Sequence, residues 1–191
     1  MGETKRIAMK TNYKDLTIWI TGASSGIGEA LTIAFAKRGA RIILSGRDKE
    51  KLAIVKSRCK NSKHHIVIPF DVTDAEQAKE AYDSAIAQAG KINWLINNAG
   101  ISQRALIMDT TEDVERQIME IDYFAQTRLS RLVLPDMLAQ GGGKIVMISS
   151  VAGLLGTQYR GAYSAAKAAI HMRAKRLRTE QYAQGIEVAT I

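Results

Sequence analysis

The chain has 191 residues, of which 46% are hydrophobic and 24% are charged, so it can bury a substantial core. Two prolines and 15 glycines without a period exclude a collagen-like chain, and apolar residues that recur throughout argue against disorder. The net charge of +8 raises the possibility of nucleic-acid binding. The basic residues are scattered, however, apart from one cluster at 173–178, and no zinc-finger spacing or aromatic-rich RNA motif accompanies them. We therefore expect no nucleic-acid partner.

The sequence predicts neither a membrane protein nor a metal-binding protein. The longest apolar runs, such as 145–148, fall far short of the roughly 20 residues of a spanning helix, and the N-terminal arm (1–14) is too polar for a signal peptide. Cys59 is the only cysteine and cannot form an internal disulfide, and neither it nor His64, His65 and His171 has metal-ligand spacing. We expect a cytoplasmic protein without a metal.

Short apolar runs alternate with helical patterns along the whole chain. The predicted strands are 16–20, 41–44, 65–70, 92–96, 144–148 and 186–191, and the predicted helices are 29–38, 48–59, 74–90, 111–138 and 161–183. Asp48 and Asp74 are expected to cap two of these helices. Strands joined by helices of this length require right-handed crossovers and a parallel sheet. The sequence predicts one doubly wound α/β domain of the Rossmann type, with about six strands and helices on both faces.

A glycine-rich turn, TGASSGIG at 21–28, separates the first strand from its helix. Glycines at such points let the backbone turn tightly and approach a ligand, and the N-terminus of the following helix favours an anion such as a dinucleotide pyrophosphate. A glycine-rich turn without a ligand is the alternative, since short motifs often mislead. The candidate cofactor residues in this turn are Gly22, Ser24, Ser25, Gly26, Ile27 and Gly28.

The end of the second strand predicts which cofactor is preferred. An acidic residue there would bind the ribose 2′-hydroxyl of NAD, but the sequence has Ser45 and Arg47. A guanidinium beside a hydroxyl suits the extra phosphate of NADP, because arginine binds phosphate in a bidentate manner. The alternative is that Arg47 is a solvated loop charge. We expect NADP(H) to be favoured over NAD(H).

Tyr163 and Lys167 lie four residues apart in the last predicted helix, so their side chains share one face. An adjacent ammonium favours the phenolate over the phenol, which makes the pair a candidate general acid/base. Ser150 follows the fifth predicted strand, and ligands of open parallel sheets bind beyond the carboxyl ends of strands. Tyr159, four residues before Tyr163, is expected to line the substrate mouth.

These motifs together make the chain similar to the short-chain dehydrogenases/reductases from about residue 16 to residue 191. The matching positions are Thr21-Gly22-x-x-x-Gly26-x-Gly28, Asp71-Val72, Asn97-Asn98-Ala99-Gly100, Ser150 and Tyr163-x-x-x-Lys167. The resemblance implies that Asp71 and Val72 contact the adenine and that Asn98, Ala99 and Gly100 support the cofactor. It also implies that Ser150 orients the substrate oxygen, that Tyr163 transfers a proton to or from it, and that Lys167 binds the nicotinamide ribose.

The sequence departs from the family pattern in two catalytic respects. The family usually has an asparagine where this chain has Asp122, in the middle of the long helix after the fourth strand. A carboxylate there could pair with Lys167 and change the electrostatics at Tyr163. The chain also stops at Ile191, within the expected sixth strand, whereas relatives continue with a nicotinamide-contacting turn, a substrate-covering segment and a seventh strand. We therefore expect these residues alone to bind cofactor weakly and to catalyse poorly.

The third departure concerns assembly. Relatives commonly pair through the outer faces of the two helices that end here near residues 138 and 183. Arginines on the flanks and outer faces of these helices would meet their own copies across a two-fold axis, which is costly when they are desolvated. The residues concerned are Arg128, Arg131, Arg173, Arg176 and Arg178. We expect a weakened homo-oligomer interface, with an ordinary solvated face as the alternative.

The leading hypothesis is an NADP(H)-dependent oxidoreductase that interconverts a small-molecule carbonyl and an alcohol. The alternative is a dinucleotide-binding scaffold without catalysis.

Overall fold

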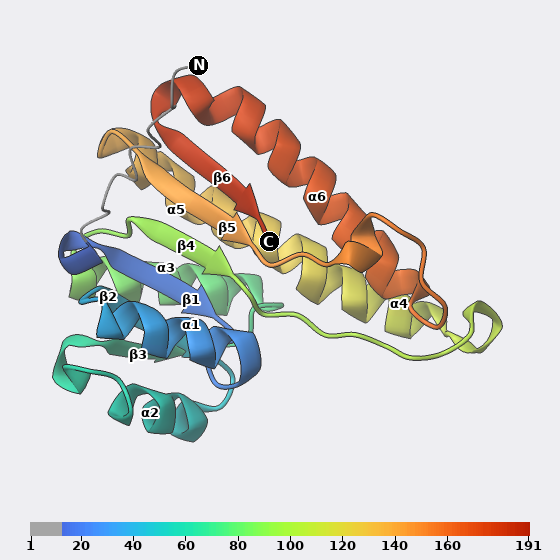
Figure 1. Cartoon of the computed structure of the whole chain (residues 1–191), viewed down its shortest axis with the longest axis horizontal. Helices are drawn as coiled ribbons and strands as arrows, with labels where there is room; N and C mark the ends of the chain where they lie inside the picture. The colour runs from blue at the N-terminus through green and yellow to red at the C-terminus, as the bar shows by residue number, and fades with distance from the viewer. Residues whose placement is uncertain (1–12) are drawn as a thin grey trace, which may run out of the picture.

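The structure, a computed structural model, describes residues 13–191, so the predicted polar arm falls almost entirely outside the described residues. The described part contains a parallel sheet with the strand order β3-β2-β1-β4-β5-β6, which confirms the predicted doubly wound fold (Figure 1). The strands are β1 (Thr17–Thr21), β2 (Arg41–Gly46), β3 (Ile66–Pro69), β4 (Trp94–Asn97), β5 (Gly143–Met147) and β6 (Ile186–Thr190).

Helices cover both faces of this sheet because the chain turns back at β1: it moves outwards from β1 to β3, and then from β4 to β6 on the other side. The helices are α1 (Gly26–Lys37), α2 (Lys49–Ser57), α3 (Ala75–Ala89), α4 (Glu112–Met119), α5 (Gln126–Ala139) and α6 (Gly161–Gln181). One apolar cluster joins α1 and α2 to one face of the sheet, and a larger cluster joins α3, α5 and α6 to the other (Figure 1).

The sheet forms the centre of the core. Ile18, Trp19 and Ile20 of β1 are fully buried, as expected for a central parallel strand that is covered on both faces. Both predicted helix caps are confirmed. The Asp48 side chain accepts a hydrogen bond from the Lys51 amide (3.0 Å), and that of Asp74 accepts one from the Gln77 amide (3.0 Å).

The helix predicted over 111–138 is interrupted in the structure. A π-helical turn, Glu120–Ala125, joins α4 to α5. Each π turn holds an extra residue, which rotates the side chains that follow around the helix axis, and such turns are frequent at functional sites. Asp122 lies within this turn and is fully buried, facing α6. Hydrophobic periodicity could not reveal the turn, because the pattern on either side remains helical.

The predicted patch of outward-facing arginines needs correction at Arg128. Its side chain turns inward, pairs with Glu120 (2.8 Å) and donates to the Val72 carbonyl (2.9 Å). On α6, Arg176 pairs with Glu180, and Arg178 donates to the carbonyl of Val188. Arg128 and Arg176 are therefore paired with carboxylates, whereas Arg178 bonds to a neutral carbonyl, and the weakened oligomer interface remains a prediction.

Within residues 13–191, none of the helices combines the length and apolar character that crossing a lipid bilayer requires.

Candidate active site

The glycine turn after β1 is built as its sequence requires. Gly22 and Gly26 have positive φ angles of 63° and 56°, which side-chain-bearing residues rarely adopt. A Cβ atom on Gly28 would lie 2.2 Å from the Gly22 carbonyl oxygen, so no other residue fits there. The first intrahelical bond of α1 runs from the Glu29 amide to the Ser25 carbonyl. The Ala23 amide donates to the Ser45 carbonyl (3.0 Å), whereas the amides of residues 26–28, in the first turn of α1, have no acceptor within the helix, which suits an anion.

The loop after β4 is tied to this turn by side-chain hydrogen bonds. The amide nitrogen Nδ2 of Asn98 donates to the carbonyls of Thr21 (3.0 Å) and Gly22 (3.1 Å). In return, the Thr21 hydroxyl accepts from the backbone amides of Asn98 and Ala99, each at 3.1 Å. These four bonds fix the spacing between the two loops. Asn98 therefore holds the glycine turn against the loop after β4. Its support of the cofactor, which the resemblance implies, stays a prediction.

A pocket of about 570 Å³ opens beyond the carboxyl ends of β1, β2, β3 and β4. All of the predicted cofactor residues line it except Gly26, Gly28, Ser45, Tyr163 and Lys167. Sequence reasoning missed Thr73, Gln117 and Glu120, which also line the pocket. The wall of the pocket formed by Gln117, Glu120 and Ile121 could have been identified from the sequence. These residues have the i, i+3 and i+4 spacing that places side chains on one face of a helix.

Ser45 and Arg47 occupy different environments. The Ser45 side chain is fully buried and its hydroxyl accepts a hydrogen bond from the Trp19 indole nitrogen (2.9 Å). The expectation that it faces the cofactor is therefore wrong, because alternation along β2 turns it to the same face of the sheet as Trp19, which α3 and α5 cover. Arg47 is exposed at the pocket edge, and the hydroxyl-bearing residue that shares this edge is Ser24.

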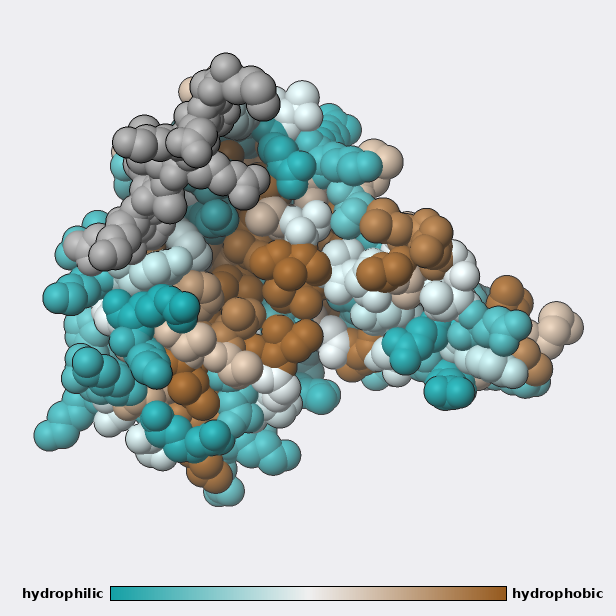
Figure 2. All heavy atoms as spheres, in the orientation of Figure 1, coloured by the Kyte–Doolittle hydropathy of each residue, from teal (hydrophilic) through white to brown (hydrophobic). Residues whose placement is uncertain are grey.

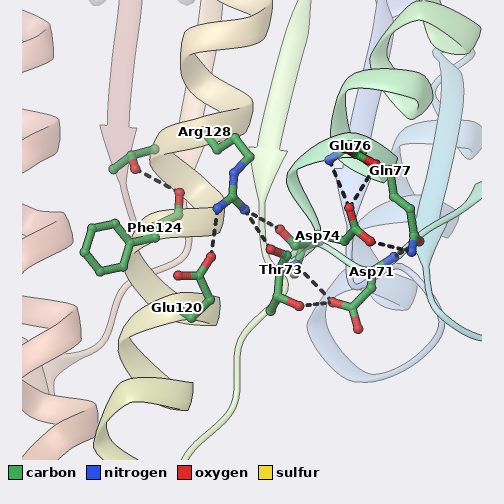
Figure 3. A network of polar contacts seen from close by, with 10 residues as sticks. Asp71, Thr73, Asp74, Glu76, Gln77, Glu120, Phe124 and Arg128 are labelled. Carbon is green, nitrogen blue, oxygen red and sulfur yellow. Dashed lines mark hydrogen bonds and ion pairs between the residues drawn. The ribbon is translucent and has the colours of Figure 1, made fainter.

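Asp71 lies at the wall of the pocket with half of its carboxylate already engaged. Its Oδ1 atom accepts from the backbone amide of Thr73 (2.9 Å) and from the Thr73 hydroxyl (2.8 Å). The backbone amide of Asp71 donates to the Gln77 side chain (3.1 Å). Figure 3 shows this turn held against the start of α3. Among residues 13–191, both hydrogen bonds to the Asp71 carboxylate are made to Oδ1, so Oδ2 can accept a further one.

Lys167 and Asp122 form a buried ion pair, as predicted from the sequence. The Lys167 Nζ atom lies 3.1 Å from Asp122 Oδ2, with side-chain exposures of 4% and 0%. Nζ also donates to the Ile148 carbonyl (2.9 Å), and Asp122 Oδ1 accepts from the Ile101 amide (2.8 Å). Burial raises the pKa of the Asp122 carboxyl above its usual range, and the Lys167 charge opposes that shift.

The Tyr163 ring lies close to Lys167, one member of this ion pair. Its centroid is 5.5 Å from Lys167 Nζ, and the Arg160 guanidinium lies 5.7 Å from the same centroid. The side chain is partly exposed, so its hydroxyl can meet a ligand from solvent. The structure thus brings together the tyrosine, the lysine and the carboxylate that the sequence singled out.

Ser150 lies just beyond β5, at the start of a tight turn that packs on α6. Its hydroxyl accepts from the Ala152 amide (3.1 Å). A Cβ atom on Gly153 would lie 2.6 Å from the Lys167 backbone, which shows how closely this turn contacts the helix. Three neighbours, Val151, Leu154 and Leu155, are between 61% and 68% exposed. Figure 2 shows hydrophobic atoms at the surface where Figure 1 draws the segment between β5 and α6.

Tyr159 lies on the same loop in a left-handed conformation (φ 65°), with the Arg104 guanidinium 5.7 Å from its ring centroid. Its carbonyl accepts from the Ala105 amide (3.1 Å), which joins the segment after β4 to the segment before α6. Tyr159 does not line the pocket described above, and its predicted place at a substrate mouth stays a prediction.

Comparison with known proteins agrees with this geometry. The family described as short chain dehydrogenase matches residues 16–191. The chain belongs to this family. It is 39% identical over 171 residues to dehydrogenase/reductase SDR family member 7 from Homo sapiens, which covers 87% of this chain and 50% of the relative. It is 35% identical over 194 residues to family member 7B from Danio rerio, covering 98% of this chain and 63% of the relative.

Two solved structures share the fold. A short-chain dehydrogenase from Streptomyces avermitilis superposes with a TM-score of 0.88 at 34% identity, over 92% of this chain and 64% of that one. A gluconate 5-dehydrogenase from Burkholderia cenocepacia, in complex with NADP and tartrate, gives a TM-score of 0.87 at 30% identity, over 93% and 70%. The chain spans 50% of the length of the relative from Homo sapiens and 63% of the length of the relative from Danio rerio.

Proposed function

We propose that this protein is an NADP(H)-dependent oxidoreductase that interconverts a carbonyl and a secondary alcohol, with Tyr163 as the general acid/base. The observation that carries this proposal is the position of Lys167: a fully enclosed ammonium, anchored by Ile148 and Asp122, 5.5 Å from the ring centroid of a solvent-accessible tyrosine. Such an ammonium stabilises a phenolate, which allows the tyrosine to exchange a proton with a substrate oxygen.

The residues of the pocket fit a dinucleotide. The closely packed Gly22 and Gly28 leave the space beside the turn free of side chains, and the amides at the start of α1 favour a pyrophosphate. Asp71 offers a free carboxylate oxygen at the far wall, where an amino group of a base can donate to it. A bound nicotinamide dinucleotide would supply or accept the hydride.

The residues of the chain divide the remaining work. Tyr163 gives a proton to the substrate oxygen during carbonyl reduction and takes it back during alcohol oxidation. Lys167 lowers the free energy of the phenolate, and Asp122 and the Ile148 carbonyl hold the ammonium in place. Ser150, next to the turn that contacts Lys167, orients the substrate oxygen by a hydrogen bond.

The preference for NADP(H) rests on Arg47. The described acidic residues that line the pocket, Asp71 and Glu120, follow β3 and β4 and not β2. Arg47 is exposed at the pocket after β2, next to Gly46, where a Cβ atom would meet the Ser24 hydroxyl at 3.7 Å. A 2′-phosphate there would gain a charge-assisted hydrogen bond that a 2′-hydroxyl cannot match. The NADP complex of the gluconate 5-dehydrogenase is compatible with this preference.

A screen of ketones, aldehydes and secondary alcohols, followed by absorbance of the reduced nicotinamide, tests the catalytic proposal. Tyr163→Phe should lower kcat by about 10²- to 10⁴-fold, the usual contribution of general acid–base catalysis, while dinucleotide affinity and Tm stay within error. Dinucleotide binding without any turnover, or full activity in the phenylalanine variant, contradicts the proposal.

Titration of intrinsic fluorescence with NADPH and NADH tests the cofactor preference separately. Arg47→Ala should raise the Kd for NADPH by about tenfold and leave the Kd for NADH unchanged, because the lost contact serves the 2′-phosphate alone. Arg38→Ala is the control, since Arg38 carries the same charge at the opposite end of α1. Equal loss for both dinucleotides contradicts a role in phosphate recognition.

We also propose that the protein works in a reducing compartment such as the cytoplasm. Cys59 is the only cysteine of the chain, so no internal disulfide can form, and its thiol is free and buried, which is typical of proteins from reducing compartments. Fractionation of the source cells tests this proposal, and recovery of the protein from an oxidising compartment contradicts it.

A further inference from the structure

Arg128 makes three side-chain hydrogen bonds at the wall of the pocket, one of them to a carboxylate. It lies on α5, and its guanidinium donates through Nη1 to the carbonyls of Val72 (2.9 Å) and Thr73 (3.3 Å). Through Nη2 it donates to the Glu120 carboxylate (2.8 Å). Figure 3 shows the side chain reaching from its helix to the loop of Thr73, with Glu120 against the guanidinium. Two elements far apart in the sequence are thus joined at the pocket wall.

The contact with Val72 acts on a single peptide group. The carbonyl of Val72 and the amide of Thr73 belong to the same planar peptide unit. Arg128 holds the carbonyl end of this unit at 2.9 Å, and Asp71 Oδ1 accepts from the amide end, also at 2.9 Å. The plane of the peptide is therefore fixed from both sides, and the fixed amide in turn fixes the rotamer of the Asp71 carboxylate.

Arg128 also reduces the negative charge at the wall of the pocket. Glu120 lines the pocket, and the ion pair with Arg128 offsets its negative charge. The pair is only partly exposed, with side-chain exposures of 26% and 36% for Arg128 and Glu120. Without the guanidinium, an unpaired carboxylate would face a site that has to accept an anionic nucleotide.

We propose that Arg128 is a positioning residue for the base end of the cofactor site: it orients Asp71 and Val72 through the 72–73 peptide and neutralises Glu120. This inference rests on the proposed function, because it assumes that a dinucleotide occupies the pocket. Through Asp71, Arg128 then helps to select a base that carries an amino group. The oriented Asp71 carboxylate accepts a hydrogen bond from such an amino group, but it repels a carbonyl oxygen at the same position.

The first test compares two nucleotides by calorimetry: NADP⁺, and its deamino analogue, which has a carbonyl oxygen in place of the adenine amino group. Wild type should bind NADP⁺ more tightly. Arg128→Met, which keeps the aliphatic stem but removes the donors, should raise the Kd for NADP⁺ by about tenfold and reduce the preference over the deamino analogue. Arg131→Met is the matched control, since Arg131 is exposed on the same helix and should change neither value.

A double-mutant cycle separates positioning from general destabilisation. If Arg128 acts through Asp71, the Arg128→Met substitution costs little base selectivity in an Asp71→Ala background, so the two effects on selectivity are not additive. Arg128→Lys should restore part of the affinity, because one ammonium can reach either the loop or Glu120 but cannot span both as a forked guanidinium does. Tm values of all variants identify any that fail to fold.

Amide hydrogen exchange of the nucleotide-free protein provides a readout that needs no cofactor. Arg128→Met should accelerate exchange in the 71–74 segment, where the Thr73 amide is protected by Asp71, and leave the segment of β6 unchanged. If wild type binds neither nucleotide, the proposed function fails and the inference with it. If wild type binds NADP⁺ and Arg128→Met keeps the same Kd, selectivity and exchange, only the inference is overturned.

Discussion

Replacement of Asp122 by asparagine isolates the charge at the centre of the catalytic group. The amide is isosteric with the carboxylate, but its single oxygen can replace either Asp122 Oδ1, which accepts from the Ile101 amide at 2.8 Å, or Oδ2, which faces Lys167. The negative charge 3.1 Å from Lys167 is lost. Because that charge opposes the effect of the ammonium on Tyr163, we expect Asp122→Asn to raise turnover.

The size of the effect follows from the distances. Asp122 Oδ2 lies 3.1 Å from Lys167 Nζ, which lies 5.5 Å from the Tyr163 ring centroid, so the carboxylate lies no farther from the ring than the sum of these two distances. At an effective dielectric constant of about 20, a unit charge at a distance of about 9 Å contributes about 2 kcal/mol. Tyr163 is partly exposed, so solvent screening reduces the gain on removal to about 1 kcal/mol, or about fivefold in kcat.

The assay is steady-state turnover of the wild type and of Asp122→Asn with the best substrate from the screen, in both directions, at several pH values. Chemical denaturation should accompany it to show that the variant remains folded. Asp122→Ala is the contrasting variant. It removes the acceptor of the Ile101 amide and the negative partner of Lys167, so the free energy of unfolding should fall by about 3 kcal/mol or more. Equal or lower turnover in a folded asparagine variant would refute the electrostatic reasoning.

Two further predictions concern the framework. Gly28→Ala should lower the free energy of unfolding by at least about 2 kcal/mol, because its Cβ would lie 2.2 Å from the Gly22 carbonyl oxygen; Gly156→Ala, where a Cβ meets nothing within 4 Å, is the control in urea titrations. Burial lowers the pKa of His65, so the unfolded state binds its proton first as pH falls below about 6.5. Wild-type stability should therefore drop between about pH 7 and pH 5 more steeply than that of His65→Gln, and parallel pH curves would contradict a buried neutral imidazole.

The sequence by itself determined the architecture. Alternating apolar runs and helical patterns, with carboxylate caps at Asp48 and Asp74, predict the elements to within a few residues, because caps and periodicity act locally. The strict glycine positions between β1 and the first turn of α1 and the four-residue spacing of Tyr163 and Lys167 are local features too, so these residues could be identified before the fold was known.

Only the tertiary structure decided where the remaining polar side chains point. Ser45 belongs to the strand end that the sequence singled out, yet the pleat turns its hydroxyl to Trp19. Arg128 resembles any solvated arginine until β3 and α5 come together and its guanidinium meets the Val72 carbonyl. The π-helical turn that carries Asp122 leaves no trace in the apolar pattern. These features depend on contacts between segments distant in the chain, whose energies no local pattern encodes.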